Sequence, residues 1–354
     1  MSVTAQLPGS ASLAGAYARC ERLARDHYEN FPVASRLLPS PMRPHVAAVY
    51  AFARVADDLA DEGARPATER QQLLDDWLGR LQHVAGQFSA GKPVDSGDED
   101  AAAIFLALGH TIRECRLPAA PFEDLLCAFR QDTWKTRYET FDEVLDYCRR
   151  SANPVGRLVL RIAGYDDPRI DTASDGVCTA LQLANFWQDL ERDWQRGRLY
   201  VPLEEIRAAG ASELDLDRRH VTGAWRDLIS SLVARTRAIF LRGRPVADMV
   251  RGRLRIELRL TWLGGIRILE QLECHGFDVF GHRPMLGSRD VPVLLWRAAS
   301  WRTGIQGPSE RARSSAIDSE RVPTSDPRER SGDRGVPARE RAGRSGGAKP
   351  PGTA

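Results

Sequence analysis

Apolar residues recur three and four positions apart along almost the whole chain, which is the spacing of one face of an α-helix. The alternation that a half-buried β-strand requires is nearly absent. Proline and glycine fall between the periodic segments, as at Pro118, Gly197 and Gly210. The pattern therefore predicts an all-α bundle of about eight to twelve helices in one domain, residues 1–302. The clearest helical segments are 101–116, 121–132, 141–150, 155–163 and 223–242.

The composition changes after residue 302. Residues 303–354 are rich in Ser, Arg, Gly, Pro and Glu, with no aromatic residue and few aliphatic ones. Such a segment cannot bury enough apolar surface to offset its ordering entropy, so we expect a disordered, low-complexity tail. After Trp301 the chain has eleven Lys or Arg and seven Asp or Glu. This basic excess leaves a second interpretation, a tether to an anionic membrane or partner.

Charge and cysteine usage limit the class of protein. The formal net charge is +2 over 354 residues, which argues against nucleic-acid binding driven by bulk charge. The six cysteines are scattered without a C-x-x-C pair, a pattern that favours buried, reduced thiols over disulfides or a zinc site. No secretory signal and no stretch of about 18 uncharged apolar residues is present, so we expect a cytoplasmic protein.

A short apolar segment, VPVLLWRAASW at 291–301, precedes the tail. It is either a last helix packed on the bundle or an interfacial helix that lies on a lipid surface. So short a segment is marginal for stable membrane binding on its own. Packing is therefore preferred, and peripheral contact with the inner face of the membrane is the alternative.

The first acidic motif lies in VYAFARVADDLADEG, where Asp57 and Asp61 are four positions apart. On a helix this spacing puts both carboxylates on one face, one turn apart, where they repel each other. The preceding turns are apolar, so we expect this helix to be substantially buried. A buried acidic face favours a bound cation.

The second acidic motif lies in ALQLANFWQDLERDWQ, where Gln182, Asn185, Asp189 and Asp193 follow spacings of three, four and four. The spacing predicts one polar stripe along a helix that is otherwise apolar. Such a stripe is usually just the solvated face of a helix. A stripe of amides and carboxylates alone, with a second acidic pair elsewhere, instead indicates a metal site.

Magnesium accounts for both motifs. It prefers oxygen ligands, and proteins usually hold it with one or two carboxylates plus substrate phosphates. Two acidic helices that face each other across a bundle could hold several such ions on one diphosphate and so promote its departure from carbon. A lone D-x-x-x-D is common by chance, whereas Q-x-x-N-x-x-x-D-x-x-x-D beside a second pair is a stronger signal.

Basic and aromatic residues near the motifs are candidate substrate contacts. Arg54 lies one turn before the first motif, where it could reach a phosphate or pair with a neighbouring aspartate. Arg198 and Tyr200 follow the second motif on an expected loop and could close over a diphosphate. For Tyr147 and His27 the alternative to a substrate contact is a structural role in the core.

Taken in order, these residues resemble the squalene and phytoene synthases, the head-to-head isoprenyl diphosphate synthases. The resemblance covers about residues 15–285. It implies an all-α isoprenoid synthase fold, a magnesium cluster and a deep hydrophobic channel for C15 or C30 chains. The matching positions are His27, Phe31, Tyr50, Arg54, Asp57, Asp61, Arg137, Tyr138, Tyr147, Gly156, Gln182, Asn185, Asp189, Asp193 and RLYVP at 198–202.

The resemblance also assigns roles. It implies that Asp57, Asp61, Asp189 and Asp193 bind magnesium diphosphate. It places Tyr147 beside the reacting carbons, and Asn185 and Arg54 are further catalytic candidates. The candidate substrate contacts are His27, Phe31, Tyr50, Arg54, Arg137, Tyr147, Ser151, Gln182, Asn185, Arg198 and Tyr200.

The stretches ENFPVASRLLP, SANPVGRLVLRIAGY, LQLANFWQDL and LTWLGGIRILE look like the hydroxysqualene synthase branch of the hopanoid pathway. The chain departs from the family's commoner pattern at Gln188, where Arg is usual, at Gly265, where Tyr is usual, and at 151–154. These departures fit an enzyme specialised for ionising presqualene diphosphate and capturing the rearranged cation with water. Tyr147, Ser151 and Asn185 are the candidates for holding that water, although Ser151 could instead bond back to the Tyr147 carbonyl.

The expected function is conversion of presqualene diphosphate and water to hydroxysqualene and diphosphate. Mg²⁺ is the expected cofactor and NADPH is not, since no G-x-G-x-x-G fingerprint occurs. The expected partners are a prenyl diphosphate, a membrane surface and neighbouring pathway enzymes, with no nucleic acid. The alternatives are a presqualene diphosphate, phytoene or dehydrosqualene synthase and, from another class, a non-catalytic scaffold relative free to lose its metal-binding carboxylates.

Overall fold

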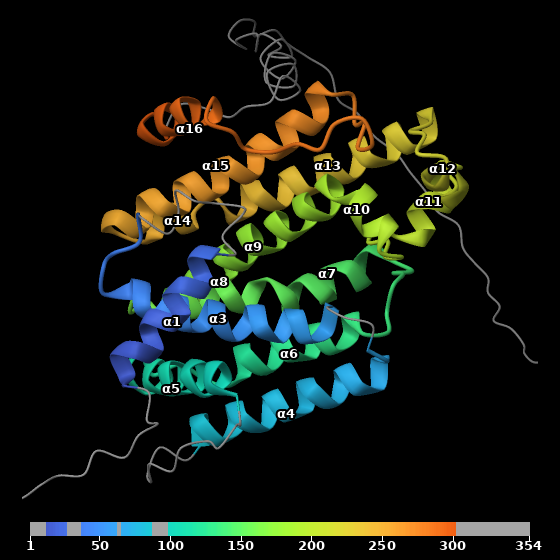
Figure 1. Ribbon diagram of the computed structural model, residues 1–354. Coiled ribbons are helices and arrows are strands. Elements are labelled where there is room, and N and C mark those ends of the chain that lie inside the picture. The colour runs from blue at the N-terminus through green and yellow to red at the C-terminus, as the bar shows by residue number, and fades with distance from the viewer. Residues whose placement is uncertain (1–11, 27–36, 62–64, 87–97, 302–354) are drawn as a thin grey trace, which may run out of the picture. The chain divides into compact units, whose positions relative to one another are not determined.

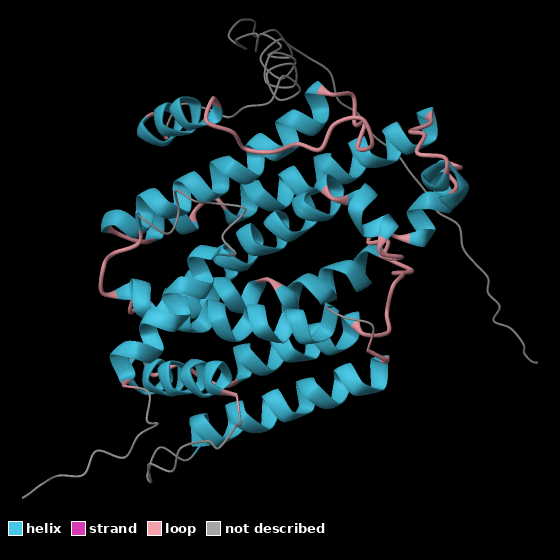
Figure 2. Cartoon of the chain, in the orientation of Figure 1, coloured by secondary structure: helices cyan, strands magenta, loops and turns pink. Residues whose placement is uncertain are grey.

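The computed structural model describes residues 12–26, 37–61, 65–86 and 98–301 (Figure 1). Regular structure in these ranges is helical and includes no strand (Figure 2), so the all-α prediction is confirmed. The predicted contacts His27 and Phe31 and the predicted tail lie outside the described residues. The helices are α1 (Leu13–Asp26), α3 (Met42–Asp61), α4 (Ala67–Gly86), α5 (Glu99–Glu114), α6 (Ala120–Asp132), α7 (Phe141–Ser151), α8 (Asn153–Ile162), α9 (Pro168–Gln188), α10 (Leu190–Gln195), α11 (Leu203–Ala209), α12 (Glu213–Asp217), α13 (Gly223–Gly243), α14 (Val246–Met249), α15 (Gly252–Cys274) and α16 (Asp290–Ala299).

The described residues form more helices than the eight to twelve expected. Four of them, α10, α11, α12 and α14, have between four and seven residues. Helices this short span at most two turns, so they leave no repeat that periodicity can detect. The five longer segments predicted from the spacing correspond to α5, α6, α7, α8 and α13.

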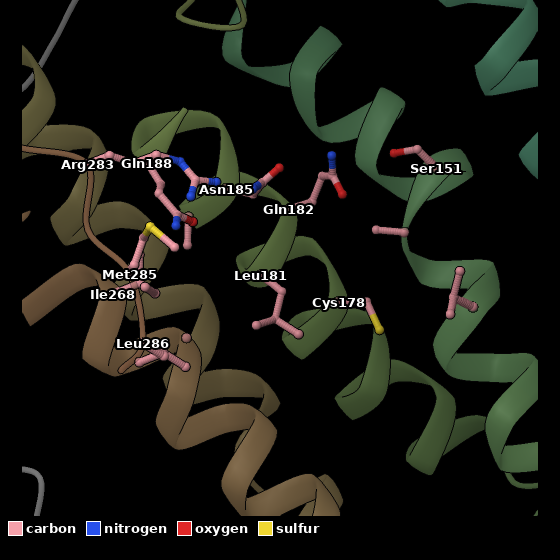
Figure 3. Close-up of a pocket in the computed structure, with 14 residues that line it drawn as sticks. Ser151, Cys178, Leu181, Gln182, Asn185, Gln188, Ile268, Arg283, Met285 and Leu286 are labelled. Carbon is pink, nitrogen blue, oxygen red and sulfur yellow. The ribbon is translucent and has the colours of Figure 1, made fainter. Parts of the chain in front are cut away.

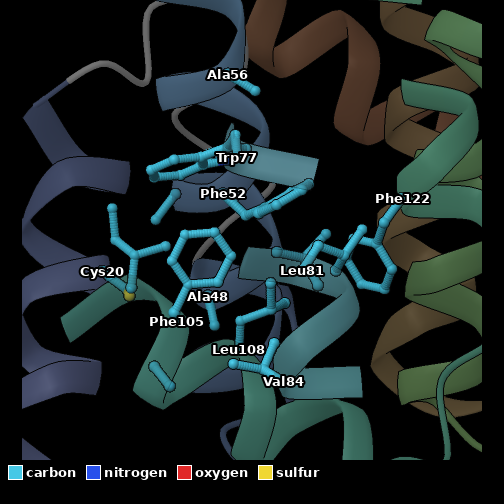
Figure 4. Close-up of a cluster of buried hydrophobic side chains, with 14 of the residues drawn as sticks. Cys20, Ala48, Phe52, Ala56, Trp77, Leu81, Val84, Phe105, Leu108 and Phe122 are labelled. Carbon is cyan, nitrogen blue, oxygen red and sulfur yellow. The ribbon is translucent and has the colours of Figure 1, made fainter. Parts of the chain in front are cut away.

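An aromatic core holds the first half of the described chain together (Figure 4). Phe52 of α3 lies at its centre, with its ring centroid 5.9 Å from that of Trp77 and 5.5 Å from that of Phe122. Phe105 of α5 packs edge-on against Phe52 at 6.0 Å. Because these four rings are almost completely buried, they fix α3 against α4, α5 and α6. The helix that bears the first acidic motif is thereby held in place.

The second half is built on α9, α13 and α15, which lie side by side (Figure 1). At the closest approach of α9 and α13, Gly243 packs against the backbone of Gly176 and Val177. The Trp187 indole also donates to the Thr236 hydroxyl at 2.9 Å, which joins the same two helices. These contacts fix the helix that bears the second acidic motif.

A single β-bridge links two loops near the motifs. Residues 137 and 199 pair in parallel, and the Leu199 amide donates to the Thr136 carbonyl at 2.9 Å. The Leu203 amide donates to the Tyr138 carbonyl at the same distance. The loop after α10, with Arg198 and Tyr200, is therefore fixed against the loop between α6 and α7.

The last described helix, α16, packs on α15. The ring centroid of Trp301 lies 5.4 Å from that of Trp262, and Arg267 donates to the Asp290 carboxylate at 2.7 Å. The outer face of α16 exposes Trp296, at 68%, so the packed position leaves the interfacial alternative open. None of the described helices combines the length and the apolar character needed to cross a membrane.

We predict that Gly243→Ala destabilises the protein by about 1–3 kcal/mol, because the new methyl group would overpack the contact between α9 and α13. A Cβ atom at this position would lie 2.6 Å from the Val177 nitrogen. The matched control is Gly79→Ala on α4, where a Cβ atom meets nothing within 4 Å. The higher helix propensity of alanine should raise the free energy of unfolding of this variant by about 0.5–1 kcal/mol. Urea unfolding measures both. Equal shifts in the two variants would contradict the prediction.

Candidate active site

The first acidic motif occupies the last turns of α3. Arg198 binds both carboxylate oxygens of Asp61, with Nη1 2.9 Å from Oδ2. The same guanidinium donates to the backbone carbonyl of Asp132 at 3.3 Å. Its side chain is only 16% exposed. Arg198, predicted as a diphosphate contact, thus lies directly on the first motif.

The second motif does not lie on one continuous helix as the spacing predicted. The α9 helix ends at Gln188, and Asp189 separates it from α10. The break is local, because the Asp189 amide still donates to the Asn185 carbonyl at 2.8 Å and the Asp193 amide to the Asp189 carbonyl at 2.9 Å. The Asp189 carboxylate accepts from Asn185 Nδ2 at 2.9 Å and from two nitrogens of Arg283, a residue outside the helix. These side-chain contacts occur at the broken turn.

Both motifs lie within reach of the Arg198 charge, which acts on Asp57 and Asp193 as well as on Asp61. Burial, followed by the neighbouring Asp61 carboxylate, raises the pKa of Asp57 to about 6. Burial, followed by the Asp189 carboxylate, raises the pKa of Asp193 to about 7. In each motif one carboxylate is therefore paired with an arginine, and the pKa of the other is raised, so that added positive charge nearby would favour its ionised form.

This set of donors fits a hard divalent cation that is shared with phosphate. Carboxylate oxygens are the protein ligands that Mg²⁺ prefers, and it usually takes one or two of them. Among the described residues, no three acidic, histidine or cysteine side chains come close enough to form a closed metal centre. Coordination here would need substrate oxygens as well, together with movement of the arginines that hold Asp61 and Asp189.

A cavity of about 340 Å³ opens beside the second motif, between α8, α9 and α15 (Figure 3). Asn185, Gln188 and Arg283 line the part of the cavity next to Asp189. The remaining lining is mostly apolar, a combination that suits a polar head group on an apolar chain. The other lining residues are Ser151, Ala152, Val155, Cys178, Leu181, Gln182, Ala184, Gly265, Ile268, Met285 and Leu286.

Ser151 presents an unsatisfied hydroxyl to this cavity. Its Oγ atom is buried and has no hydrogen-bond partner among the described residues, so it does not bond back to the Tyr147 carbonyl. In Figure 3 the hydroxyl points across the cavity toward Gln182 of α9. A buried hydroxyl without a partner indicates a place for a water molecule or a polar ligand group.

Gly265 forms part of the α15 wall. A Cβ atom at this position would lie 2.8 Å from Cε1 of Phe240 and 2.9 Å from Cδ2 of Leu181. Phe240 is fully buried and takes up the space beside the glycine. The missing side chain at 265 is therefore compensated by a neighbouring ring rather than by an enlarged cavity.

Tyr147 does not line the cavity, unlike Ser151 one turn later on α7. Its hydroxyl donates to Oδ2 of Asp132 at 2.6 Å. Burial raises the pKa of Asp132 to about 7, and its Oδ1 atom has no partner among the described residues. Asp132 was not among the residues predicted from the sequence. The available signal was an acidic residue in the last turn of an apolar helix, where the helix dipole disfavours negative charge.

Tyr147 belongs to an aromatic cluster with Tyr138, Phe186 and Tyr200. Its ring centroid lies 5.8 Å from the centroids of both other tyrosines. Phe186 and Tyr200 stack with their centroids 3.8 Å apart. All four rings are buried. Tyr200 is thus a core residue that positions the Arg198 loop, and not a side chain that is free to close over a diphosphate as predicted.

Arg54 pairs with Asp58, with Nε 3.2 Å from Oδ2. Its Nη1 atom is 3.7 Å from the Asp57 carboxylate, so the ion-pair alternative for this residue describes the structure. Tyr50, one turn earlier on α3, lies close enough to act on the Arg54 charge. Tyr50 and Arg54 therefore lie on the same face of α3 as the first motif.

Arg137 is not brought to the cavity. It donates to the Gly197 carbonyl at 2.7 Å and to the Glu213 carboxylate at 3.1 Å. Its guanidinium also lies 5.0 Å from the ring centroid of Trp194. These contacts tie the Arg198 loop to α12, so the contribution of Arg137 to the site is indirect.

The sequence matches the family model described as squalene/phytoene synthase over residues 24–297, a range that contains both acidic motifs and the cavity. The chain belongs to the squalene/phytoene synthase family. Members of this family are isoprenoid synthases that act on prenyl diphosphates. The family predicted from the residues is therefore confirmed.

The similar proteins within the squalene/phytoene synthase family carry the names of different enzymes. Hydroxysqualene synthase of Rhodopseudomonas palustris is 34% identical over 251 residues, 69% of this chain and 80% of that protein. The chloroplastic phytoene synthase 2 of Zea mays is 30% identical over 298 residues, 81% of this chain and 71% of that protein. The crystal structure of squalene synthase HpnC from Alicyclobacillus acidocaldarius is 40% identical, with a TM-score of 0.68, and covers 76% of this chain and 97% of that one.

We predict that Asp132→Asn stabilises the metal-free protein at pH 8 more than at pH 5. The folded-state pKa of Asp132 is raised to about 7, so its contribution to stability is present at low pH and is lost as pH rises toward 7. The amide in Asp132→Asn does not ionise, so the variant would not lose this stability at high pH; the free energy of unfolding concerned is at most about 4 kcal/mol. Urea unfolding at both pH values, with exposed Asp76→Asn as the control, measures the difference. A stabilisation that is equal at the two pH values would contradict the assignment.

Proposed function

We propose that this protein ionises presqualene diphosphate and captures the rearranged cation with water, which releases hydroxysqualene and diphosphate. The observation that carries the proposal is that Arg198 acts on Asp57, Asp61 and Asp193, while Asp189 lies next to a mostly apolar cavity that contains the unpartnered Ser151 hydroxyl. The first feature suits a departing diphosphate, and the second suits a C30 cation and a water molecule.

The carboxylates of Asp57, Asp61, Asp189 and Asp193 would hold Mg²⁺ together with the substrate diphosphate. Bound there, Mg²⁺ would supply Lewis-acid stabilisation of the leaving group. Arg198 lies at the first motif with a charge that it keeps at any physiological pH. It would exchange Asp61 for a diphosphate oxygen when the substrate arrives. The carbon–oxygen bond then breaks, and its electron pair leaves with the diphosphate.

The cavity would hold the cation away from bulk water. Its wall offers few polar groups, and those nearest the hydrocarbon are Ser151 and Gln182, which face each other (Figure 3). A water molecule bound between them would add its oxygen to the cation, and the released diphosphate would take its proton. Of the three residues first considered for holding this water, Ser151 and Asn185 line the cavity, whereas Tyr147 lies behind it and supports α7.

A second candidate is head-to-head condensation of two prenyl diphosphates. The similarity to phytoene synthase and to squalene synthase HpnC favours this candidate. It would use the same four aspartates but would need room for two chains. A non-catalytic scaffold role is disfavoured, because such a protein would be free to lose these carboxylates and all four are present. Peripheral contact with a membrane, as a source of the apolar substrate, would agree with either reaction.

We predict that replacing any one of Asp57, Asp61, Asp189 or Asp193 by Asn lowers turnover at least about a hundredfold while the fold is retained. Each change removes charge from the site that would hold the metal diphosphate. The matched control is Asp227→Asn on the exposed face of α13, which should keep full activity. Steady-state product formation and circular dichroism provide the two readouts. Near-normal turnover in two of the four variants would contradict the assignment of these aspartates as metal ligands.

We also predict that presqualene diphosphate, Mg²⁺ and H₂¹⁸O yield an alcohol that carries ¹⁸O, without any nicotinamide cofactor. Mass spectrometry of the extracted product gives the label, and omission of Mg²⁺ is the control. Squalene formed only when NADPH is added would refute water capture. Turnover of farnesyl diphosphate but not of presqualene diphosphate would favour the condensing enzyme instead.

A further inference from the structure

The segment from Arg283 to Leu286, between α15 and α16, forms one wall of the cavity (Figure 3). Its contacts with other described residues include the following three. Arg283 binds Asp189, and Gln188 Nε2 donates to the Pro284 carbonyl at 2.6 Å. The Met285 amide donates to Oε1 of Gln271, on α15, at 3.0 Å. Two of the three contacts therefore come from adjacent residues at the end of α9.

The contact with Asp189 is weakened when a divalent ion binds that carboxylate, because the ion repels the guanidinium. Both oxygens are already engaged, one by Arg283 Nε and the other by Arg283 Nη2 and Asn185 Nδ2. Both side chains are largely buried, with 21% and 15% exposed for arginine and aspartate. A divalent ion beside the guanidinium would place like charges a few ångströms apart where little water screens them.

The contact made by Gln188 is of a different kind. A neutral amide donates to a neutral carbonyl, so the arrival of a cation at the next residue does not repel it. Pro284 is buried and has no N–H group with which to make a bond of its own. Its carbonyl is the point at which the wall can stay joined to α9.

We propose that Arg283 and the divalent metal compete for Asp189, and that Gln188 is the positioning residue that keeps the wall on α9 once the metal is bound. This inference rests on the proposed function, which puts the metal at Asp189. It gives Gln188, where the family's commoner pattern has an arginine, a specific task. Met285 and Leu286 stay against the substrate chain while the neighbouring ion pair is exchanged for metal.

The competition is tested by Mn²⁺ binding in the presence of inorganic diphosphate, followed by electron paramagnetic resonance. Arg283→Gln should bind Mn²⁺ about fivefold or more tightly than the unmodified protein, because the competing cation is gone. Arg283→Lys, which keeps the charge but not the two-point contact, should fall between them. The matched control is Arg289→Gln, an exposed arginine on the same inter-helix segment. Unchanged or weaker Mn²⁺ binding in Arg283→Gln would overturn the proposal.

The task of Gln188 is tested by hydrogen–deuterium exchange of peptides that cover 281–287, with and without Mn²⁺ and inorganic diphosphate. In the unmodified protein the segment should stay protected in both states. In Gln188→Leu it should lose protection, by about tenfold or more in exchange rate, only when Mn²⁺ and diphosphate are present. The control is Gln195→Leu, which removes an exposed side-chain hydrogen bond on α10.

The exchange experiment separates failure of the Gln188 role from failure of the proposed function. Equal protection of Gln188→Leu and the unmodified protein in both states would overturn the role of Gln188. So would a loss of protection that is the same with and without metal, since that describes a purely structural bond. If the unmodified protein binds no Mn²⁺ even with diphosphate present, the proposed function itself fails, and the inference that rests on it fails too.

Discussion

The ion pair between Arg198 and Asp61 is the interaction on which the arrangement of the site depends. It joins α3 to the loop after α10 across 137 positions of sequence. The neighbouring carboxylates of Asp57, Asp61 and Asp193 would otherwise repel one another, because they are partly buried and water screens them less than at the surface. The guanidinium keeps its charge at any physiological pH. The two motifs can therefore face each other before any ligand is present.

The helical fold could be predicted from the sequence because the signal for it is local. The repeat in 141–150 and in 223–242 depends only on residues one or two turns apart, whatever each helix packs against. The same is true of Asp57 and Asp61, whose spacing along α3 places them on one face. Asp189 and Asp193 could likewise be recognised locally, because their four-residue spacing directly follows the apolar helix α9.

The contacts that complete the site could not be predicted, because they join residues remote in sequence. Arg283 lies 94 positions after Asp189 and belongs to no motif. Asp132 meets Tyr147 only because α6 and α7 pack side by side. The break at Asp189 has no compositional signal either, since neither glycine nor proline stands there. Packing of loops and helix ends decides all three.

Arg198 at Asp61 and Arg283 at Asp189 give the metal-free protein a balance of charge of its own. In a zinc finger, by contrast, the ion supplies the folding free energy and the chain is unfolded without it. In this protein the two arginines offset the charge of Asp61 and Asp189 without an ion, so we expect the chain to fold where divalent ions are scarce. Under the proposed function, the supply of magnesium would set how many molecules are ready for reaction, and not how many are folded.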